Sequence, residues 1–366
     1  MKKLRMAIIG TGGMGSGHAA VVQNVEEVQL CAVADARIEQ AKKIGEKYSI
    51  PAYGDYKAML KEVKPDFVLV ATPHPAHAKV AVDAFAAGAH VLSEKPMASN
   101  PIEADRMIAA AEKHGKLLGV MFQQRTEAAR RKVREIVRSG ALGEIYRVDM
   151  IASGYRSQAY YNSGAWRGTW AGEGGGVLLN QAPHDLDQFI WIAGMPTSVT
   201  GQVETRVHQI EVEDSASAMV GYANGARGYI HVSTVEHPAT YRLEVCGDNG
   251  KVVFDGKEIK LSMLDPSIRE FTRASTQAWS FPAVKEQTVE VAPGPAGHAE
   301  VTRDFAKAIA EGRQPVAPGR EGVLSLELAA AMIFSSHRGK TVQMPLSRQA
   351  YNRFLKDKCK TSRYVG

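Results

Sequence analysis

Residues 4–15 read LRMAIIGTGGMG, and this stretch decides the fold. Six mostly apolar residues predict a buried strand, and Gly10, Gly12 and Gly15 follow it at once in a GxGxxG arrangement. A helical stretch comes next, and then a second strand, VQLCAVAD, which ends at Asp35 about 20 residues beyond the last glycine. Strand, glycine turn, helix, strand and acidic residue occur in the order of a dinucleotide-binding βαβ unit.

Each glycine of this loop has its own physical reason. Gly10 permits the tight turn, Gly12 lets the backbone approach a pyrophosphate, and Gly15 allows the helix to pack closely on the strand. The exposed amides and the dipole at the helix N-terminus favour a diphosphate, so Gly13 and Met14 belong to the expected cofactor site.

The type of dinucleotide depends on the end of the second strand. Asp35 can accept hydrogen bonds from the adenosine ribose hydroxyls, and its charge would repel a 2′-phosphate, which predicts NAD. Arg37 could bind that phosphate, so NADP stays open. A glycine-rich turn of some other α/β protein is the alternative, and the flanking strands with Asp35 disfavour it.

The alternation of strands and helices continues to about residue 124. Strands are predicted within 64–73, 89–96 and 116–125, and helices within 77–89 and 100–115. This pattern predicts a doubly wound parallel sheet, in which ligands bind beyond the carboxyl ends of the strands. The side chains at those ends are Thr72, Pro73, Glu94, Lys95, Gln123 and Arg125.

The rest of the chain has a different character. Strands alternate with sharp turns between about 197 and 263, and the dipeptides Asn224–Gly225 and Asn249–Gly250 are strong hairpin signals. We therefore predict an α/β protein with two domains, a Rossmann domain over 1–124 and an α+β domain over 125–366. The second domain is expected to have a large, mostly antiparallel open sheet, and a helix near its end returns towards the first domain.

Composition excludes several classes of function. The formal charge of +6 is mild and the basic residues are scattered, so we expect no nucleic-acid partner. The three cysteines lack CxxC spacing and the histidines lack metal-ligand spacing, so no disulfide framework and no metal are expected. No stretch reaches the roughly 18 apolar residues of a membrane span. These features predict a cytoplasmic protein, and its open sheet predicts a homodimer or homotetramer.

Residues 174–187, GGGVLLNQAPHDLD, carry the second candidate site. The glycine run would let the backbone approach a ligand closely. Because Pro183 is tolerated only in a first helical turn, the helix is expected to begin near Asn180, which would cap it. His184 would then lie one turn inside, and Asp187 could orient it. A purely capping Asn180 and a structural His184 are the open alternatives.

Five segments together resemble the glucose–fructose oxidoreductase/inositol dehydrogenase family. They are GTGGMG (10–15), ATPHPAHAKVAVDAFAAGAHVLSEKP (71–96), GGGVLLNQAPHDLD (174–187), DFAKAIAEGRQPVAP (304–318) and GKTVQMPL (339–346). The resemblance covers nearly the whole chain, and Glu-Lys-Pro together with the GGG…H segment is its specific part.

The resemblance implies a role for most of the candidate residues. Lys95 would lie between nicotinamide and substrate, Glu94 would hold the nicotinamide ribose, and a cis peptide could precede Pro96. His184 would face the reacting carbon. The residues that would line the cofactor channel or approach the cofactor or substrate are Thr72, Pro73, His77, Trp166 and Arg167.

One departure from the family pattern affects the chemistry. Many members carry Asp where this chain has Asn180, and an amide cannot take a proton at neutral pH. Proton transfer is therefore expected to concentrate on Lys95 and on His184, whose imidazole ordinarily titrates near neutrality.

The predicted reaction is hydride transfer between nicotinamide and a secondary alcohol carbon of a sugar, sugar derivative or cyclitol. The residues predicted to bind the substrate are Lys95, Arg125, Tyr155, Trp166, Arg167, Asn180 and His184. Two alternatives remain: a glycoside-processing enzyme with tightly bound NAD that oxidises its sugar transiently, and a non-catalytic cofactor-binding regulator.

Overall fold

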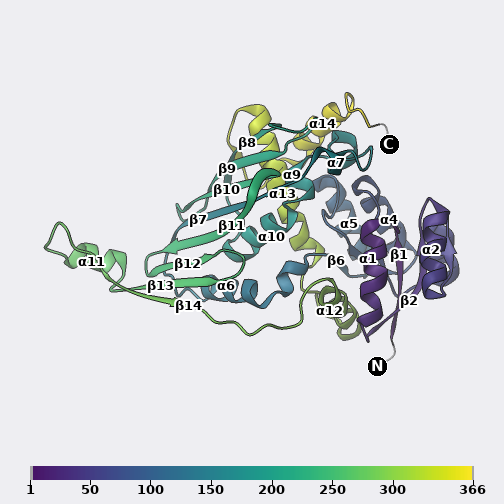
Figure 1. The fold of residues 1–366 in the computed structure, drawn as a ribbon, viewed down its shortest axis with the longest axis horizontal. Coiled ribbons are helices and arrows are strands. Elements are labelled where there is room, and N and C mark those ends of the chain that lie inside the picture. The colour runs from purple at the N-terminus through teal and green to yellow at the C-terminus, as the bar shows by residue number, and fades with distance from the viewer. Residues whose placement is uncertain (1–2, 365–366) are drawn as a thin grey trace.

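The computed structural model describes residues 3–364. Two sheets form the framework, and Figure 1 shows them side by side, with the N-terminal sheet at the right. No helix in the described range is long and apolar enough to cross a membrane.

The first sheet has six parallel strands in the order β3-β2-β1-β4-β5-β6, which is the predicted doubly wound arrangement. Its strands are β1 (Leu4–Ile9), β2 (Val28–Ala34), β3 (Ala52–Tyr53), β4 (Phe67–Val70), β5 (His90–Ser93) and β6 (Leu118–Val120). The sequence interpretation missed β3, because a two-residue strand carries no periodicity.

Helices cover both faces of this sheet. They are α1 (Gly13–Val21), α2 (Ile38–Tyr48), α3 (Tyr56–Val63), α4 (His74–Ala86) and α5 (Pro101–Lys113), with the 3₁₀ turns η1 (Val22–Asn24) and η2 (Gln123–Thr126). The Asn100 side chain caps α5 by accepting the Glu103 N–H, and Pro101 takes the first helical position. The domain boundary predicted after residue 124 falls inside η2 and stays a prediction.

The second sheet has nine strands in the order β14-β13-β12-β11-β7-β10-β9-β8-β15. They are β7 (Ile145–Tyr155), β8 (Ser198–Glu204), β9 (Ser215–Gly221), β10 (Arg227–Ser233), β11 (Val235–Gly247), β12 (Gly250–Phe254), β13 (Ile259–Asp265), β14 (Ala283–Thr288) and β15 (Val342–Gln343). Within the described range, β7 and β10 are the only parallel neighbours of this second sheet. The Asn224–Gly225 and Asn249–Gly250 turns form the two predicted hairpins.

Most helices of the second part pack on one face of this sheet or return to the first sheet, and one lies between β13 and β14. They are α6 (Ala128–Arg138), α7 (Gln158–Tyr161), α8 (Trp170–Glu173), α9 (Val177–Asn180), α10 (Pro183–Ala193), α11 (Ile268–Ala274), α12 (His298–Glu311), α13 (Gly319–Arg338) and α14 (Arg348–Cys359). Helix α13 packs on β8 of the second sheet and also on α5 and β6 of the first part.

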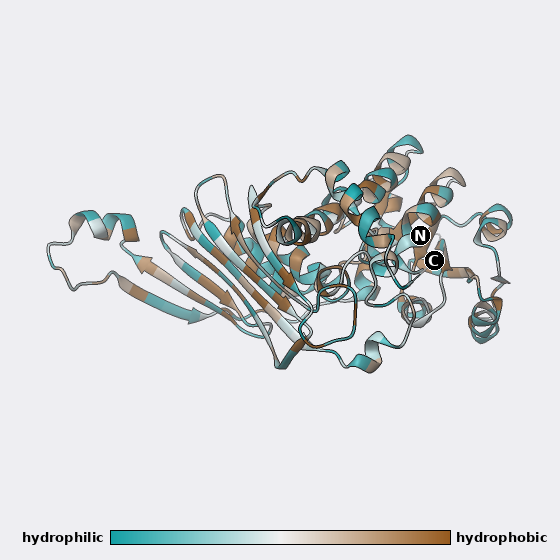
Figure 2. Cartoon of the chain, turned by 90° about the horizontal axis from the view of Figure 1, so that it is seen from above, coloured by the Kyte–Doolittle hydropathy of each residue, from teal (hydrophilic) through white to brown (hydrophobic). Residues whose placement is uncertain are grey.

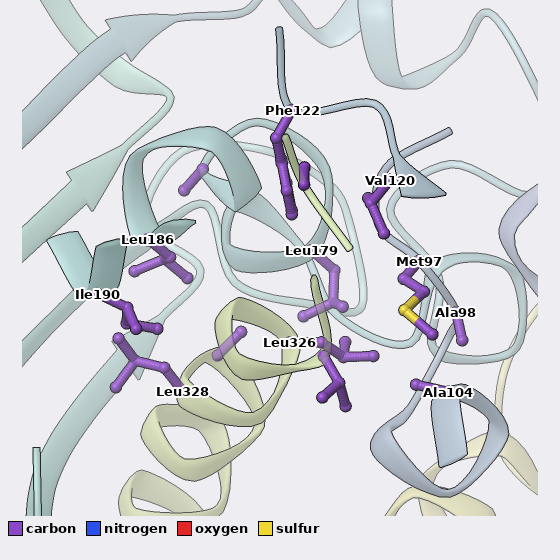
Figure 3. Packing of buried hydrophobic residues seen from close by; sticks show 14 of the residues in the cluster. Met97, Ala98, Ala104, Val120, Phe122, Leu179, Leu186, Ile190, Leu326 and Leu328 are labelled. Atoms are coloured by element: carbon purple, nitrogen blue, oxygen red, sulfur yellow. The ribbon is translucent and has the colours of Figure 1, made fainter. Parts of the chain in front are cut away.

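A shared apolar core fixes the two halves relative to each other. Figure 3 shows Met97 and Phe122 from the first half near Leu179 and Leu186 from α9 and α10, with Leu326 of α13 completing the cluster. Each fully buried side chain of this size stabilises the fold by about 1.5–3 kcal/mol. The core therefore holds the loop after β5 firmly against the segment that contains His184.

Alternating polar and apolar residues along the strands account for the one-sided covering of the large sheet (Figure 2). At its edge, β13, α11 and β14 project as an arm. Trp279 and Phe281 on this arm are 90% and 82% exposed.

Candidate functional site

The glycine loop leaves the amino end of α1 open. Gly12 is the N-cap residue, and no side chain of the described residues caps the first amides of the helix. Gly10 adopts a φ of +94° and lies so close to Ala71 that a Cβ atom at residue 10 would meet the Ala71 backbone at 2.6 Å. The loop therefore needs glycine for the turn, and it presents free N–H groups where a diphosphate would bind.

Asp35 holds this loop in place. Its Oδ2 accepts hydrogen bonds from the Thr11 backbone N–H (2.8 Å) and hydroxyl (3.1 Å), and its Oδ1 accepts the Arg37 backbone N–H (2.9 Å). The Arg37 side chain is 74% exposed and its Nε lies 3.9 Å from the carboxylate. Asp35 thus ties the second strand to the glycine loop and keeps a negative charge beside it.

Glu94 and Lys95 follow β5 directly, at the same edge of the sheet as the glycine loop. The Glu94 carboxylate is buried and hydrogen-bonds His18 of α1 at 2.6 Å, while its other oxygen accepts the Lys95 backbone N–H. Burial alone would raise the pKa of Glu94, but the His18 hydrogen bond and the charges of His18 and Lys95 lower it to about 2. Glu94 is therefore ionised, and the Lys95–Pro96 peptide is cis, as the resemblance implied.

Lys95 spans the gap between the two halves of the molecule. Its ammonium Nζ donates a hydrogen bond of 2.8 Å to the backbone carbonyl of Asn180 at the end of α9. Burial lowers the pKa of Lys95, and the nearby Glu94 and Glu173 carboxylates oppose that shift. An amine whose pKa is lowered gives up its proton more readily, which suits proton exchange with a substrate.

His184 lies at the second position of α10, one residue after Pro183. Its Nε2 is 3.3 Å from Nε2 of Gln123, and its ring packs edge-on against Phe122. Two buried atoms, His184 Nδ1 and Gln123 Oε1, have no partner among the described residues. With the Gln123 amide turned over, Oε1 would accept the Nε2–H of His184 and leave Nδ1 as a free acceptor.

The expectation that His184 titrates near neutrality is wrong for this structure. Burial lowers its pKa to about 3, and the charge of Lys95 adds to the shift. The imidazole is therefore neutral throughout the physiological range.

Asn180 does not cap a helix, in contrast to the prediction. It is the last residue of the short α9, and α10 starts at Pro183 with Ala182 as its N-cap residue. The Asn180 side chain instead hydrogen-bonds the Glu173 carboxylate and the Tyr160 hydroxyl. Sequence reasoning missed Glu173, because nothing in its local pattern shows that it faces Asn180.

The Trp166–Arg167 pair joins the same cluster. The Arg167 guanidinium lies 4.5 Å from the ring centroids of both Trp166 and Tyr160, and its Nη1 donates 2.7 Å to the Tyr160 hydroxyl. Trp166 packs against His74 at the start of α4. The pair therefore lies beside Lys95, where its positive charge helps to lower the pKa of that amine.

Arg125 has a structural role in this protein, in contrast to the prediction that it contacts the substrate. Its Nε and Nη2 bind both oxygens of the buried Asp187 at 2.9 and 2.6 Å, and Nη1 binds the Val316 carbonyl and Glu321. Its side chain is only 2% exposed. Asp187 is thereby fully engaged and does not orient His184.

The predicted roles of His77 in the cofactor channel and of Tyr155 in substrate binding stay predictions. The two ring nitrogens of His77 lie 2.8 and 3.0 Å from the Thr72 and Pro96 carbonyls, so His77 ties two strand-end loops together. Tyr155 is the last residue of β7 and is 53% exposed.

The glycine run at 174–176 serves the packing of the protein itself. A Cβ on Gly174 would meet the Ser99 carbonyl, and one on Gly176 would overlap the Glu213 backbone. The buried Glu213 carboxylate accepts the backbone N–H groups of Gly176 and Leu178. In contrast to the prediction that these glycines let the backbone approach a ligand, they let it approach the backbone of Ser99 and Glu213.

A cavity of about 370 Å³ lies beside this cluster, between α9–α10 and strands β7 and β11. Gln181 and Asp185 line it from the helices, and Arg156, Thr234 and Tyr241 line it from the sheet side. Burial raises the pKa of Asp185 to about 7, against the charges of Arg130 and Lys95. A larger cavity of about 630 Å³ lies at the opposite, amino-terminal edge of the first sheet, away from these groups.

Three potential metal ligands also meet near β5. Atoms of His18, Glu94 and His298 lie within 4.8 Å of one another, although the three residues are far apart in the sequence. The His18–Glu94 hydrogen bond accounts for two of them without an ion. The expectation of no metal stays a prediction.

The site fits a dinucleotide. The amino end of α1 is uncapped, Gly12 and Gly13 face open space, and the buried Thr72 hydroxyl has no partner among the described residues. The uncapped end of α1 suits a diphosphate and Asp35 suits a ribose.

Two family models match the chain. The model described as oxidoreductase family, NAD-binding Rossmann fold, matches residues 4–122, and the GFO/IDH/MocA C-terminal domain matches residues 130–253.

Known proteins are similar over most of the chain. D-glucoside 3-dehydrogenase of Escherichia coli is 31% identical over 67% of this chain and 75% of its own length. Myo-inositol 2-dehydrogenase of Thermotoga maritima is 24% identical over 93% of this chain and 98% of its own. The WlbA dehydrogenase of Chromobacterium violaceum, crystallised with NADH and UDP-GlcNAcA, superimposes with a TM-score of 0.83 at 29% identity, covering 95% and 97% of the two chains.

Proposed function

Because the chain belongs to the GFO/IDH/MocA family of NAD-binding oxidoreductases, we propose that it transfers hydride between NAD and a secondary alcohol carbon of a sugar, sugar derivative or cyclitol. One contact carries the proposal: Lys95 of the first half donates to the Asn180 carbonyl of the second, four residues before His184. The charge of Lys95 also lowers the pKa of His184, so the amine and the imidazole would lie near each other beside the edge of the sheet where NAD binds.

The cofactor would be held by residues from both parts of the chain. Gly12, Gly13 and Met14 would bind the diphosphate at the start of α1, and Asp35 would bind the adenosine ribose. The groups proposed to lie around the nicotinamide half are Thr72, Pro73, Glu94, Lys95, Gln123, Trp166 and Arg167. Bound NAD⁺ supplies the hydride acceptor.

Lys95 and His184 would handle the proton of the substrate hydroxyl. An alcohol loses this proton as its carbon is oxidised, and a neutral amine with a lowered pKa can accept it. The neutral His184 would offer a second acceptor, and Gln123 would fix its ring.

The cavity beside α10 would take the rest of the substrate. Asp185, Gln181 and Arg156 are hydrogen-bonding groups at its wall, as a hydroxyl-rich ring requires. With a pKa of about 7, Asp185 is partly protonated at neutral pH and could both donate to and accept from hydroxyl groups.

A substrate screen tests the proposed function. NADH formation, followed at 340 nm, is expected with one or more members of a panel of inositols, aldoses, 1,5-anhydrosugars and glycosides. The His184→Gln variant should lower the rate with the same compound. NAD⁺ binding without turnover on any compound of the panel would contradict the proposal.

We expect the pH dependence of sugar oxidation to come from Lys95 and not from His184. Since the amine must be neutral to accept a proton, kcat/KM should rise with pH through the pKa of Lys95. His184, with a pKa of about 3, is neutral above pH 5 and adds no step near pH 6.5. His184→Gln should therefore lower kcat/KM about 100-fold without moving the midpoint of the profile. A midpoint that moves in this variant would contradict the assignment.

The charge at Asp35 should set the preference between NAD and NADP. Asp35→Asn keeps an oxygen for the Thr11 N–H but removes the charge, so the ratio of kcat/KM for NADP to that for NAD should rise about ten-fold. Arg37→Ala is the matched control and should lower NADP use while leaving NAD use nearly unchanged. Steady-state kinetics with both cofactors measure the ratio, and an unchanged ratio in Asp35→Asn would refute this role.

We also propose a homodimer or homotetramer formed through the large sheet. Helices α6, α10 and α13 cover one face, whereas Met219 of β9 is 54% exposed on the sheet and Trp279 is 90% exposed on the arm. Light scattering of the purified protein should give two or four times the 39.6 kDa of one chain. A monomer at micromolar concentration would refute this assembly.

A further inference from the structure

A hydrogen-bonded chain runs through the cluster beside Lys95 and ends on a buried carboxylate. Arg167 donates to the oxygen of Tyr160, the Tyr160 hydroxyl donates 3.2 Å to Asn180 Oδ1, and Asn180 Nδ2 donates to Glu173. The backbone carbonyl of Asn180 receives the ammonium of Lys95. One residue, Asn180, therefore connects the amine to the carboxylate.

The local structure holds Glu173 in this position. It is the last residue of α8 and is 1% exposed, and its Oε2 accepts the Gly168 backbone N–H at 2.5 Å. Burial raises the pKa of Glu173, while the bonds from Gly168 and Asn180 and the charges of Arg167 and Lys95 favour the ionised form. A buried carboxylate held by donors on both oxygens is retained at a cost in desolvation, which suggests a use for its charge.

We propose that Glu173 is the positioning residue for Lys95: through the Asn180 amide it fixes the carbonyl that receives the ammonium and places a negative charge beside it. The orientation of the amide follows from its partners, since a carboxylate must face the NH₂ group and a hydroxyl donor the oxygen. The inference rests on the proposed role of Lys95 in the reaction, but its test reads the amine directly.

Other titratable or charged groups also face Lys95, from each element packed around it. They are Glu94 after β5, Asp185 and His184 on α10, Arg167 before α8, His74 on α4 and His298 on α12. Glu94 is engaged with His18, and Asp185 lines the neighbouring cavity. Glu173 is thus the carboxylate that reaches Lys95 through a hydrogen-bonded bridge.

An exchange of the two side chains tests the pairing. Glu173→Gln removes the charge, so Lys95 should titrate about one unit lower than in the native protein. Glu173→Gln combined with Asn180→Asp returns one carboxylate and one amide to the same pair, with the hydrogen bond reversed. In this double variant, Lys95 should titrate at or above its native value.

The measurement is the ¹⁵Nζ titration of Lys95 in the NAD-bound protein with labelled lysine, assigned by Lys95→Arg. The rising limb of kcat/KM for sugar oxidation should follow the same shifts. Glu103→Gln is the matched control: it removes another carboxylate, half-buried on α5 and outside this network, and should leave Lys95 unchanged.

Several results would overturn the inference. One is an unchanged pKa of Lys95 in Glu173→Gln. Another is a pKa of Lys95 in the double variant equal to that in Glu173→Gln. If Glu173→Gln does not fold, Asn180→Ala is the deciding variant. Loss of the bridge should lower the pKa of Lys95 by less than the loss of the Glu173 charge would. An unchanged pKa would refute the pairing. A failed substrate screen would remove the proposed function but leave this titration as evidence on the pair.

Discussion

Replacement of Lys95 by methionine is expected to reduce kcat for sugar oxidation by about 10²–10⁴-fold, with NAD affinity changed less than about threefold. Methionine is unbranched and of similar length, so the side chain keeps its packing but loses the amine. The native ammonium donates to the Asn180 carbonyl, at the junction of the two halves. Single-turnover kinetics and NAD titration by fluorescence separate the two effects.

Lys79→Met is the control for this experiment. Lys79 lies on the exposed side of α4 and pairs with Asp83, so its loss should leave kcat and cofactor affinity as they are. A Lys95→Met enzyme that keeps more than a tenth of the native kcat would remove Lys95 from the reaction.

Alanine substitutions at Gly12 and Gly15 should damage the protein in different ways. A Cβ on Gly12 meets nothing within 4 Å in the described structure, so Gly12→Ala should fold with an almost unchanged Tm. Its methyl group lies where a diphosphate must approach the backbone, so the Kd for NAD should rise about 100-fold or more. Calorimetry and NAD titration together measure this loss of binding without loss of stability.

Gly15→Ala should instead destabilise the fold. A Cβ at this position would overlap the Gly10 carbonyl oxygen, so the helix must move off the strand, at about 3 kcal/mol or more. The Tm should fall by about 6–12 °C. Gly17→Ala, on the open side of the same helix, is the control and should raise stability by about 0.5–1 kcal/mol with native NAD affinity. Equal effects of the Gly12 and Gly15 substitutions on Tm would contradict the separation.

Much of the site was predictable because its signals are local in the sequence. The GxGxxG turn and Asp35 are fixed by backbone geometry within one βαβ unit, and the carboxyl ends of parallel strands must share an edge. That rule alone brought Glu94 and Lys95 to the cofactor side of the first sheet. The Asn-Gly hairpins of the second sheet were predictable for the same reason.

The errors concern side chains whose partners are distant in sequence. Arg125 looks like a strand-end ligand residue, yet Asp187 and Glu321, 62 and 196 residues away, occupy its guanidinium. Asn180 looks like a helix cap, yet a carboxylate seven residues earlier and Tyr160 of α7 engage its side chain.

By itself, the sequence determined the parallel sheet, its cofactor edge and the residue types that meet there, because these follow from local backbone rules and the order of the strands. Only the tertiary structure decided which of these side chains are free and in what charge state. His184 is neutral because residues from several distant elements exclude water from it, and Glu173 faces Lys95 because α8 and α9 fold against the loop after β5. Desolvation and pairing are sums over neighbours in space, and no stretch of sequence contains those neighbours.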